Sequence, residues 1–219
     1  MYKRFIKRLL DIVFSLSMLI ILSPLLAVLI VLVRVSIGSP FFFTQERPGY
    51  QEKVFKLYKF RTMTDGRDAQ GKLLPDRDRL TKVGLFLRKT SLDELPELIN
   101  ILKGEMSFIG PRPLLKEYLP WYTEREKLRH TVRPGLTGLA QASGRNLVDW
   151  DRRFALDVEY VENLTFAMDV KVLKMTVKQV LGHSEDVAVD TNAIEGNFAR
   201  IREERLARTG SLEDKPSED

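Results

Sequence analysis

The segment Ile12–Val33 contains no charged residue, although four basic residues precede it and Arg34 follows it. Its roughly 22 residues would extend about 33 Å as a helix at ~1.5 Å per residue, and the hydrocarbon core of a bilayer is about 30 Å thick. A cleaved signal peptide has a shorter apolar core and a small-residue cleavage site, and neither is found here. The sequence therefore predicts an N-terminal membrane element.

Ser23-Pro24 lies at the centre of this segment, where proline removes a helix hydrogen bond and clashes with the preceding turn. Two alternatives follow. The segment could be a kinked helix that spans the bilayer, which usually has its excess of Lys and Arg on the cytoplasmic side only. Alternatively, the helix breaks at Ser23-Pro24 and leaves through the leaflet it entered, which would explain basic residues on both flanks.

Composition narrows the remaining possibilities. The 219 residues leave room for one domain with a small appendage. A net charge of +5 fits nucleic acid, anionic lipid or phosphorylated small molecules as partners. The chain has no cysteine, which excludes disulfides, thiolate metal sites and cysteine nucleophiles. The two histidines, His130 and His183, cannot form a histidine-rich zinc site without carboxylates.

The pattern beyond the apolar segment predicts mainly helices. Residues 38–50, rich in glycine, proline and aromatics, predict a loop, and the alternating residues 53–63 predict a strand. Helices are predicted from Leu95 to a stop at Gly104, over 150–162 and over 168–181.

The helix predicted over 168–181 has an apolar side and a basic side. This pattern suits a helix in the membrane interface, and it also fits a packed surface helix. The two stripes are Val170, Leu173, Val177 and Val180 on one side, and Lys171, Lys174 and Lys178 on the other.

The sequence Ser91-Leu92-Asp93-Glu94-Leu95-Pro96 places two adjacent acids at the start of a predicted helix. One interpretation is a capping box, in which Ser91 and Glu94 satisfy the first backbone N–H groups. The other interpretation is chemical: one carboxylate is a nucleophile or metal ligand, and its neighbour supports it. An aspartate can attack phosphorus to form an acyl phosphate, and Mg²⁺ favours carboxylates combined with substrate phosphates.

Three arginines accompany the acids. Arg88 precedes them, Arg112 lies in a rigid turn between Pro111 and Pro113, and Arg145 ends a glycine-rich loop. One guanidinium group can donate two parallel hydrogen bonds to a pair of phosphate oxygens, a geometry that the lysine ammonium group cannot reproduce. Neither a Walker A loop nor a G-x-G-x-x-G motif after a strand is present, so any nucleotide is held by another arrangement.

Seven motifs occur in a fixed order and together resemble a known family. They are Lys-Arg-x-x-Asp at 7–11, Ser23-Pro24, Phe-Thr-Gln-Glu-Arg-Pro-Gly at 43–49, Phe-Lys-Leu-Tyr-Lys-Phe-Arg-Thr-Met at 55–63, Ser-Leu-Asp-Glu-Leu-Pro at 91–96, Met-Ser-Phe-Ile-Gly-Pro-Arg-Pro at 106–113 and Arg-Pro-Gly-Leu-Thr-Gly at 133–138. Over residues 1–182 the chain resembles the bacterial sugar transferases, the monotopic phosphoglycosyl transferases. Within this family it is similar to the small single-domain form, typified by the PglC enzyme of bacterial N-glycosylation.

The resemblance implies an α/β, predominantly helical fold. Residues 1–36 would form a re-entrant membrane helix broken at Ser23-Pro24, and residues 37–182 a catalytic domain. Interfacial amphipathic helices and a small strand element would surround an active site on the cytoplasmic face of the bacterial inner membrane. Residues 183–219 would form a C-terminal extension, partly disordered.

The resemblance also implies an activity. The enzyme would move a sugar 1-phosphate from a UDP-sugar, expected to be N-acetylated, to undecaprenyl phosphate and release UMP, the first membrane step of glycoconjugate assembly such as protein glycosylation. Asp93 would be the nucleophile and contact Mg²⁺, and Glu94 would complete the dyad as a candidate base for the lipid phosphate. Substrate would be bound by Lys59, Arg88, Arg112 and Arg145 on the phosphate side and by Pro111 and Pro113 on the uridine side. The oligomeric state is left open, with a homodimer as one possibility, and no nucleic acid is expected as a partner.

Two rival functions remain. A metal-dependent glycosyltransferase would use Asp76-Arg77-Asp78 or Asp149-Trp150-Asp151 as its Asp-x-Asp motif and would release UDP instead of UMP. A basic membrane-anchored protein would bind nucleic acid or recruit partners, with salt-sensitive binding and no turnover. The second rival leaves the pattern of acids and arginines unexplained.

Overall fold

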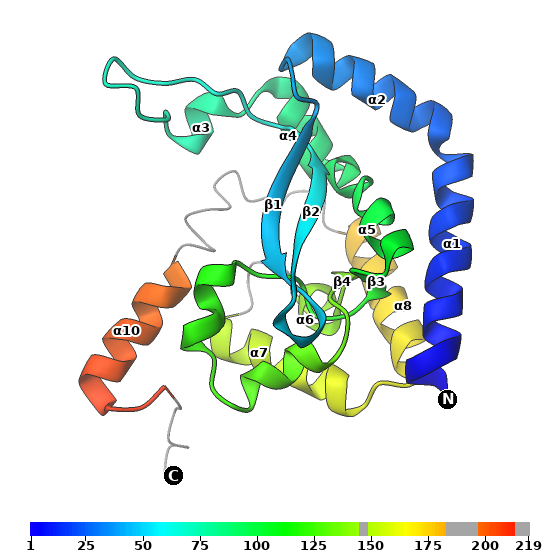
Figure 1. Cartoon of the computed structure of the whole chain (residues 1–219), viewed down its shortest axis with the longest axis vertical. Coiled ribbons are helices and arrows are strands. Elements are labelled where there is room, and N and C mark those ends of the chain that lie inside the picture. Colours follow the sequence, from blue (N-terminus) through cyan, green and yellow to red (C-terminus); the bar gives the residue numbers. More distant parts are fainter. Residues whose placement is uncertain (145–148, 183–196, 213–219) are drawn as a thin grey trace.

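The computed structural model describes residues 1–144, 149–182 and 197–212. A bent arm runs along one side of the molecule (Figure 1), made of the helices α1, Lys7–Ile21, and α2, Ser23–Ser36. The two helices meet at 64°. The Ser23 hydroxyl donates to the carbonyl oxygen of Ile20 at 2.8 Å, and Pro24 lies in the first turn of α2, where its missing N–H leaves no helical bond unmade. The helix thus breaks at Ser23-Pro24, as predicted.

The other elements follow in chain order. They are η1 Tyr2–Ile6, β1 Phe42–Pro48, η2 Tyr50–Glu52, β2 Val54–Phe60, α3 Asp76–Arg79, α4 Lys82–Lys89, η3 Leu92–Glu94, α5 Glu97–Lys103, β3 Ser107–Ile109, η4 Lys116–Trp121, η5 Glu126–Thr131, β4 Gly135–Thr137, α6 Leu139–Ala142, α7 Trp150–Glu162, α8 Phe166–Gly182 and α10 Asn197–Thr209. The expected fold, mainly helical with small strand elements, is confirmed.

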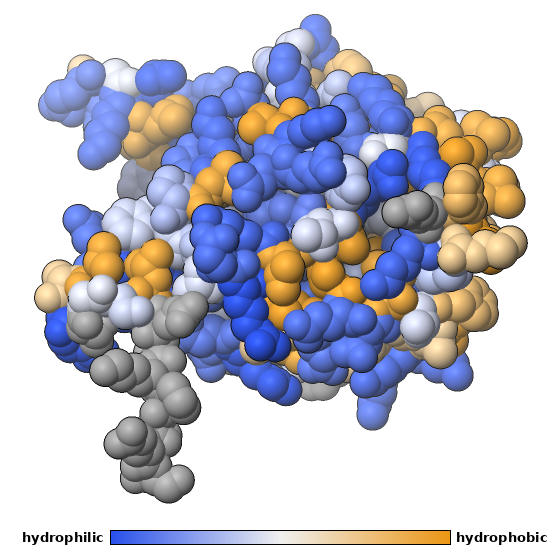
Figure 2. Space-filling view, turned by 60° about the horizontal axis from the view of Figure 1, so that its bottom comes forward, coloured by the Kyte–Doolittle hydropathy of each residue, from blue (hydrophilic) through white to orange (hydrophobic). Residues whose placement is uncertain are grey.

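Apolar side chains cover the outside of the arm. In the part of the chain that the structure describes, no single helix has the length and composition to cross a bilayer, whereas α1 and α2 pass that test together as a bent pair. Phe14, Ile21 and Val28 are 54%, 73% and 62% exposed. Figure 2 shows apolar residues gathered along the edge on which Figure 1 places α1. An apolar surface of this extent marks a contact with lipid or another protein.

Buried polar contacts fix the base of the arm to the rest of the molecule. The ammonium group of Lys7 lies 2.7 Å from the carboxylate of Asp169 in α8. Asp11 accepts hydrogen bonds from the hydroxyl of Ser107 and the N–H of Phe108, at the start of β3. Lys7, Asp11 and Asp169 are all buried, so these contacts hold the arm in one position at its base.

A long antiparallel hairpin, β1 and β2, occupies the centre of the molecule (Figure 1) and pairs Phe43 with Lys59. The strand predicted over 53–63 is confirmed for Val54–Phe60. The loop predicted over 38–50 is wrong for Phe42–Pro48, which forms β1. Its aromatic and threonine residues favour a strand, and its proline is tolerated because it stands at the strand's end. A second, parallel pair joins β3 to β4.

Helix α5 ends where the sequence predicts. Gly104 has φ 86°, a left-handed conformation that closes the helix. The side chain of Arg8 donates to the carbonyl oxygens of Ile101 and Leu102 at 2.6 and 2.8 Å. These are carbonyls that a helix end leaves without partners, so the arm also caps α5.

Helix α8 confirms the helix predicted over 168–181 and shows which side faces outward. On its inner side Val172 is fully buried, and Met168 and Met175 pack against the same core cluster. Leu173, Val177 and Val180 of the predicted apolar stripe are each at least half exposed. The stripe is therefore not packed in the core, which leaves it available for an interface with lipid.

Helix α10 packs against η4 and α7. Phe198 is fully buried among the rings of Tyr118, Tyr122, Trp150 and Phe154. Within the extension expected over 183–219, the structure describes this helix and the residues up to 212, while 183–196 and 213–219 lie outside the described residues.

Candidate active site

The two adjacent acids stand on a tight 3₁₀ turn between α4 and α5. Ser91 has φ 54°, a left-handed conformation that is uncommon for serine, and its side chain makes no capping hydrogen bond. Helix α5 begins only at Glu97. The capping-box interpretation of Ser91 and Glu94 is therefore wrong, and the conformation of this turn has to be explained by other contacts.

Glu94 is held by two cations from distant parts of the chain. Its Oε1 lies 2.6 Å from Nζ of Lys59 in β2 and 3.1 Å from Nη2 of Arg112 after β3. Burial alone would raise the pKa of Glu94, but these two charges and their hydrogen bonds lower it to about 2. Glu94 is therefore an anion at neutral pH, and it brings the two cations together.

Asp93 has a different environment from its neighbour. It is 9% exposed, and among the residues that the structure describes no hydrogen bond or ion pair engages its carboxylate. Burial and the negative charge of Glu94 raise its pKa to about 6, against the opposing charges of Lys59, Arg88 and Arg112. The two acids thus differ: Glu94 is paired with two cations, whereas the Asp93 carboxylate has no hydrogen bond or ion pair among the described residues.

Glu97 is a third acid of the site that the sequence analysis missed. It is 2% exposed, and its Oε1 lies 3.3 Å from Nζ of Lys59. Burial raises its pKa to about 7, with Glu94 adding to the rise and Lys59 opposing it. The signal was available: residues three apart on a helical turn share a face, so Glu94 and Glu97 could have been expected to lie together.

Lys59 is positioned by the attachment of β2 to α5. The side-chain amide of Asn100 donates to the carbonyl oxygen of Lys56 at 2.7 Å and accepts from the N–H of Tyr58 at 3.1 Å. Asn100 is fully buried. Because it bonds the strand immediately before Lys59, it fixes the point from which the lysine reaches Glu94 and Glu97.

The remaining predicted substrate residues are placed differently. Nε of Arg88 donates to the hydroxyl of Thr62 at 3.1 Å, and its charge is close enough to lower the pKa of Asp93. Pro111 and Pro113 are buried on either side of Arg112. Arg145 lies outside the described residues. The structure thus brings Lys59, Asp93, Glu94, Arg88 and Arg112 into one charged cluster.

The acids of the rival Asp-x-Asp motifs have local structural roles. Asp76 pairs with Arg79 at 3.4 Å within α3. Asp149 accepts from the N–H of Arg152 and so caps α7, and Asp151 pairs with Arg205 of α10 at 2.6 Å. These contacts give three of the four acids a structural role.

The charged cluster fits a magnesium ion only together with a substrate. Among the described residues no group of three or more His, Asp or Glu side chains is arranged to hold a metal. Of the two adjacent acids, Asp93 is the one whose carboxylate forms no ion pair with a described residue. Since Mg²⁺ is commonly bound by one or two carboxylates and substrate phosphates, Asp93 is a suitable ligand when a diphosphate supplies the rest.

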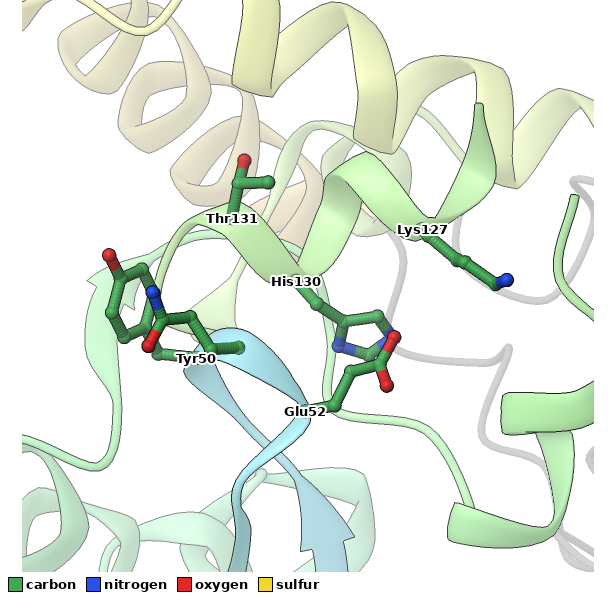
Figure 3. Close-up of a pocket in the computed structure, with 6 residues that line it drawn as sticks. Tyr50, Glu52, Lys127, His130 and Thr131 are labelled. Carbon is green, nitrogen blue, oxygen red and sulfur yellow. The ribbon is translucent and has the colours of Figure 1, made fainter. Parts of the chain in front are cut away.

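A separate hollow of about 270 Å³ lies beside the hairpin turn (Figure 3). It is lined by Tyr50, Glu52, Lys127, His130 and Thr131, among others. Burial and the charge of Arg129 lower the pKa of His130 to about 4, so its imidazole is neutral at pH 7. None of the predicted site residues lines this hollow.

Known proteins resemble this chain over most of its length. A family model described as bacterial sugar transferase matches residues 2–183. The chain is 54% identical over 176 residues to the uncharacterized sugar transferase EpsL of Bacillus subtilis. This alignment covers 80% of this chain and 87% of EpsL. It is 39% identical over 191 residues to the exopolysaccharide production protein ExoY of Sinorhizobium fredii, covering 80% of this chain and 84% of ExoY.

A longer relative matches with only part of its length. The undecaprenyl-phosphate galactose phosphotransferase of Salmonella typhimurium is 42% identical to this chain over 195 residues. The alignment covers 81% of this chain and 41% of that protein. The chain therefore corresponds to less than half of this relative.

The raised pKa of Glu97 predicts a pH-dependent stability. Its pKa is about 7 in the folded protein against 4.5 ordinarily, so its contribution to stability is complete below pH 4.5 and is lost as the pH rises through 7. Glu97→Gln removes this titration and is expected to stabilise the protein at pH 8 by up to roughly 3 kcal/mol, with little effect near pH 4.5. Unfolding in detergent at both pH values measures this, with the exposed Glu117→Gln as control. A variant less stable than the wild type at pH 8 would show that Lys59 needs a charged Glu97.

Proposed function

The chain belongs to the bacterial sugar transferase family, and we propose that it transfers a sugar 1-phosphate from a UDP-sugar to undecaprenyl phosphate and releases UMP. The observation that carries this proposal is the asymmetry of the acid pair. Asp93 has a carboxylate without a cation partner in the described structure, beside a Glu94 that already gathers Lys59 and Arg112. The Salmonella relative, a phosphotransferase named for undecaprenyl phosphate and galactose, supports the same class of reaction.

In the first proposed step, a carboxylate oxygen of Asp93 attacks the β-phosphorus of the UDP-sugar. The bond between that phosphorus and the bridging oxygen breaks, and UMP leaves with the bridging oxygen. Asp93 then carries the phospho-sugar as an acyl phosphate. Arg88, Arg112 and Lys59 supply positive charge for the phosphate oxygens, and Arg145 is proposed to add to it. Mg²⁺ bound by Asp93 and the diphosphate would neutralise further negative charge.

In the second step, a phosphate oxygen of the lipid attacks the acyl phosphate and the Asp93 carboxylate leaves. The product is an undecaprenyl diphospho-sugar. With its pKa near 2, Glu94 is a weak base at neutral pH. We therefore assign it the task of orienting Lys59 and Arg112 rather than that of a base for the lipid phosphate, the role that the sequence resemblance implied.

We further propose that the arm is re-entrant and that the site faces the cytoplasm. A water-soluble donor and a lipid acceptor meet only at the membrane surface. The 64° bend at Ser23-Pro24, the exposed apolar residues of the arm and the exposed stripe of α8 support an enzyme resting in one leaflet.

The donor sugar is the least constrained part of the proposal. The resemblance to the N-glycosylation enzymes implies an N-acetylated sugar, whereas the Salmonella relative is named for galactose. An assay should therefore include UDP-galactose and UDP-glucose beside the N-acetylated UDP-sugars.

Nucleotide release with a panel of UDP-sugars, Mg²⁺ and undecaprenyl phosphate in detergent tests the reaction class. We expect UMP release that requires the lipid for turnover and falls as the pH drops through 6, because Asp93 must be ionised. Release of UDP would instead indicate a glycosyltransferase. Salt-sensitive binding without release of either nucleotide would favour the binding protein.

The topology is tested by replacing the proline that breaks the arm. The natural chain has no cysteine, so single cysteines in an N-terminal extension and at the exposed Lys72 report sidedness by labelling of sealed vesicles. We expect both on the same side in the wild type and on opposite sides for a fraction of Pro24→Ala molecules, since alanine restores a continuous helix. Opposite sides in the wild type would exclude the re-entrant arrangement, and an unchanged sidedness in Pro24→Ala would show that the proline does not cause it.

A further inference from the structure

The turn Pro111-Arg112-Pro113 has three successive carbonyl groups, and each accepts a hydrogen bond from a different part of the chain. The N–H of Gly135 donates to the carbonyl oxygen of Pro111 at 3.0 Å. Nη2 of Arg129 donates to that of Arg112 at 2.7 Å, and Nη1 of Arg47 to that of Pro113 at 3.3 Å. Two of the three residues are prolines, which lack an N–H, so the turn depends on bonds to its carbonyls.

Arg129 is held rigidly behind this turn. Its Nε and Nη2 lie 3.1 and 2.8 Å from one carboxylate oxygen of Asp157 in α7, and its Nη1 lies 3.1 Å from the hydroxyl of Tyr122. Its charged group stacks 5.5 Å from the ring centres of Tyr122 and Phe154. Arg129 is 3% exposed, so it cannot meet a substrate. Its planar group offers donors in fixed directions, and one of these ends on Arg112.

The side chain of Arg112 points the other way, into the charged cluster, and lies 3.1 Å from Glu94. Its main chain is thus fixed from behind by Arg129 while its guanidinium is presented in front. Displacement of a substrate-binding group by about 1 Å can cost a hundredfold in rate. Resting on the function proposed above, we propose that Arg129 is a positioning residue for Arg112, acting through the Arg112 carbonyl, and that Arg47 supports the same turn from β1.

The test separates positioning from mere stabilisation with a double-mutant cycle. Arg129→Lys keeps the charge opposite Asp157, but one ammonium cannot reproduce the bonds to Asp157, Tyr122 and the Arg112 carbonyl. We expect kcat/KM for the UDP-sugar to fall about 10- to 100-fold, but by less than about threefold in a chain that already carries Arg112→Ala. The change in melting temperature should be the same in both backgrounds. Val172→Ala, a fully buried position in α8, is the control: it should lower the melting temperature and leave kcat/KM nearly unchanged.

Equal losses of kcat/KM in the wild-type and the Arg112→Ala backgrounds would overturn the proposal, as would a loss no larger than that of Val172→Ala. The cycle is repeated with Arg47→Lys, which alters the donor to the Pro113 carbonyl. A smaller loss of kcat/KM is expected there, and it should again disappear in the Arg112→Ala background. Full activity of a folded Arg47→Lys would remove Arg47 from the proposal.

The outcome can be distinguished from failure of the proposed function. The nucleotide released by the wild type, UMP or UDP, decides the reaction class. The affinities of the same variants for UMP and for the UDP-sugar are measured without turnover. They show whether the effect of Arg129→Lys on binding depends on the presence of Arg112.

Discussion

The carboxylate of Glu94 is the contact on which the charged cluster depends. It is shared by Lys59 and Arg112, two cations that would repel each other in its absence. Two further acids, Asp93 and Glu97, lie within reach of these charges. Because all of these groups are at least partly withdrawn from water, their interactions are stronger than on an open surface. The two cations lower the pKa of Glu94, whereas burial, together with the negative charge of Glu94, raises the pKa values of Asp93 and Glu97.

The cluster draws on segments that also hold the arm. Arg8 caps the end of α5, the helix that begins at Glu97, and Asp11 bonds the start of β3, the strand that leads into the turn of Arg112. The base of the arm is therefore attached to two of the elements that present the site. If the arm rests in the membrane as proposed, these bonds set the distance between the lipid surface and Asp93.

Sequence reasoning predicted the regular elements well where the pattern was periodic. The helix over 150–162 and the end of α5 at Gly104 are found as expected. It also selected the residues that form the charged cluster. It missed β1, because glycine and proline near 38–50 obscured the short run of strand formers. The turn at Ser91 and the burial of Glu97 and Arg129 could not be predicted from the sequence. All three features depend on contacts between segments that are far apart in sequence.

The proposed mechanism requires Asp93 to form a covalent bond to the phospho-sugar. Intact-protein mass spectrometry after incubation with the accepted UDP-sugar and Mg²⁺, without lipid, tests it most directly. We expect the intact mass to increase by one phospho-sugar, which digestion assigns to the peptide containing Asp93, together with an equal amount of released UMP and neither product with Asp93→Asn. UMP release without an adduct, or an adduct that persists in Asp93→Asn, would contradict it.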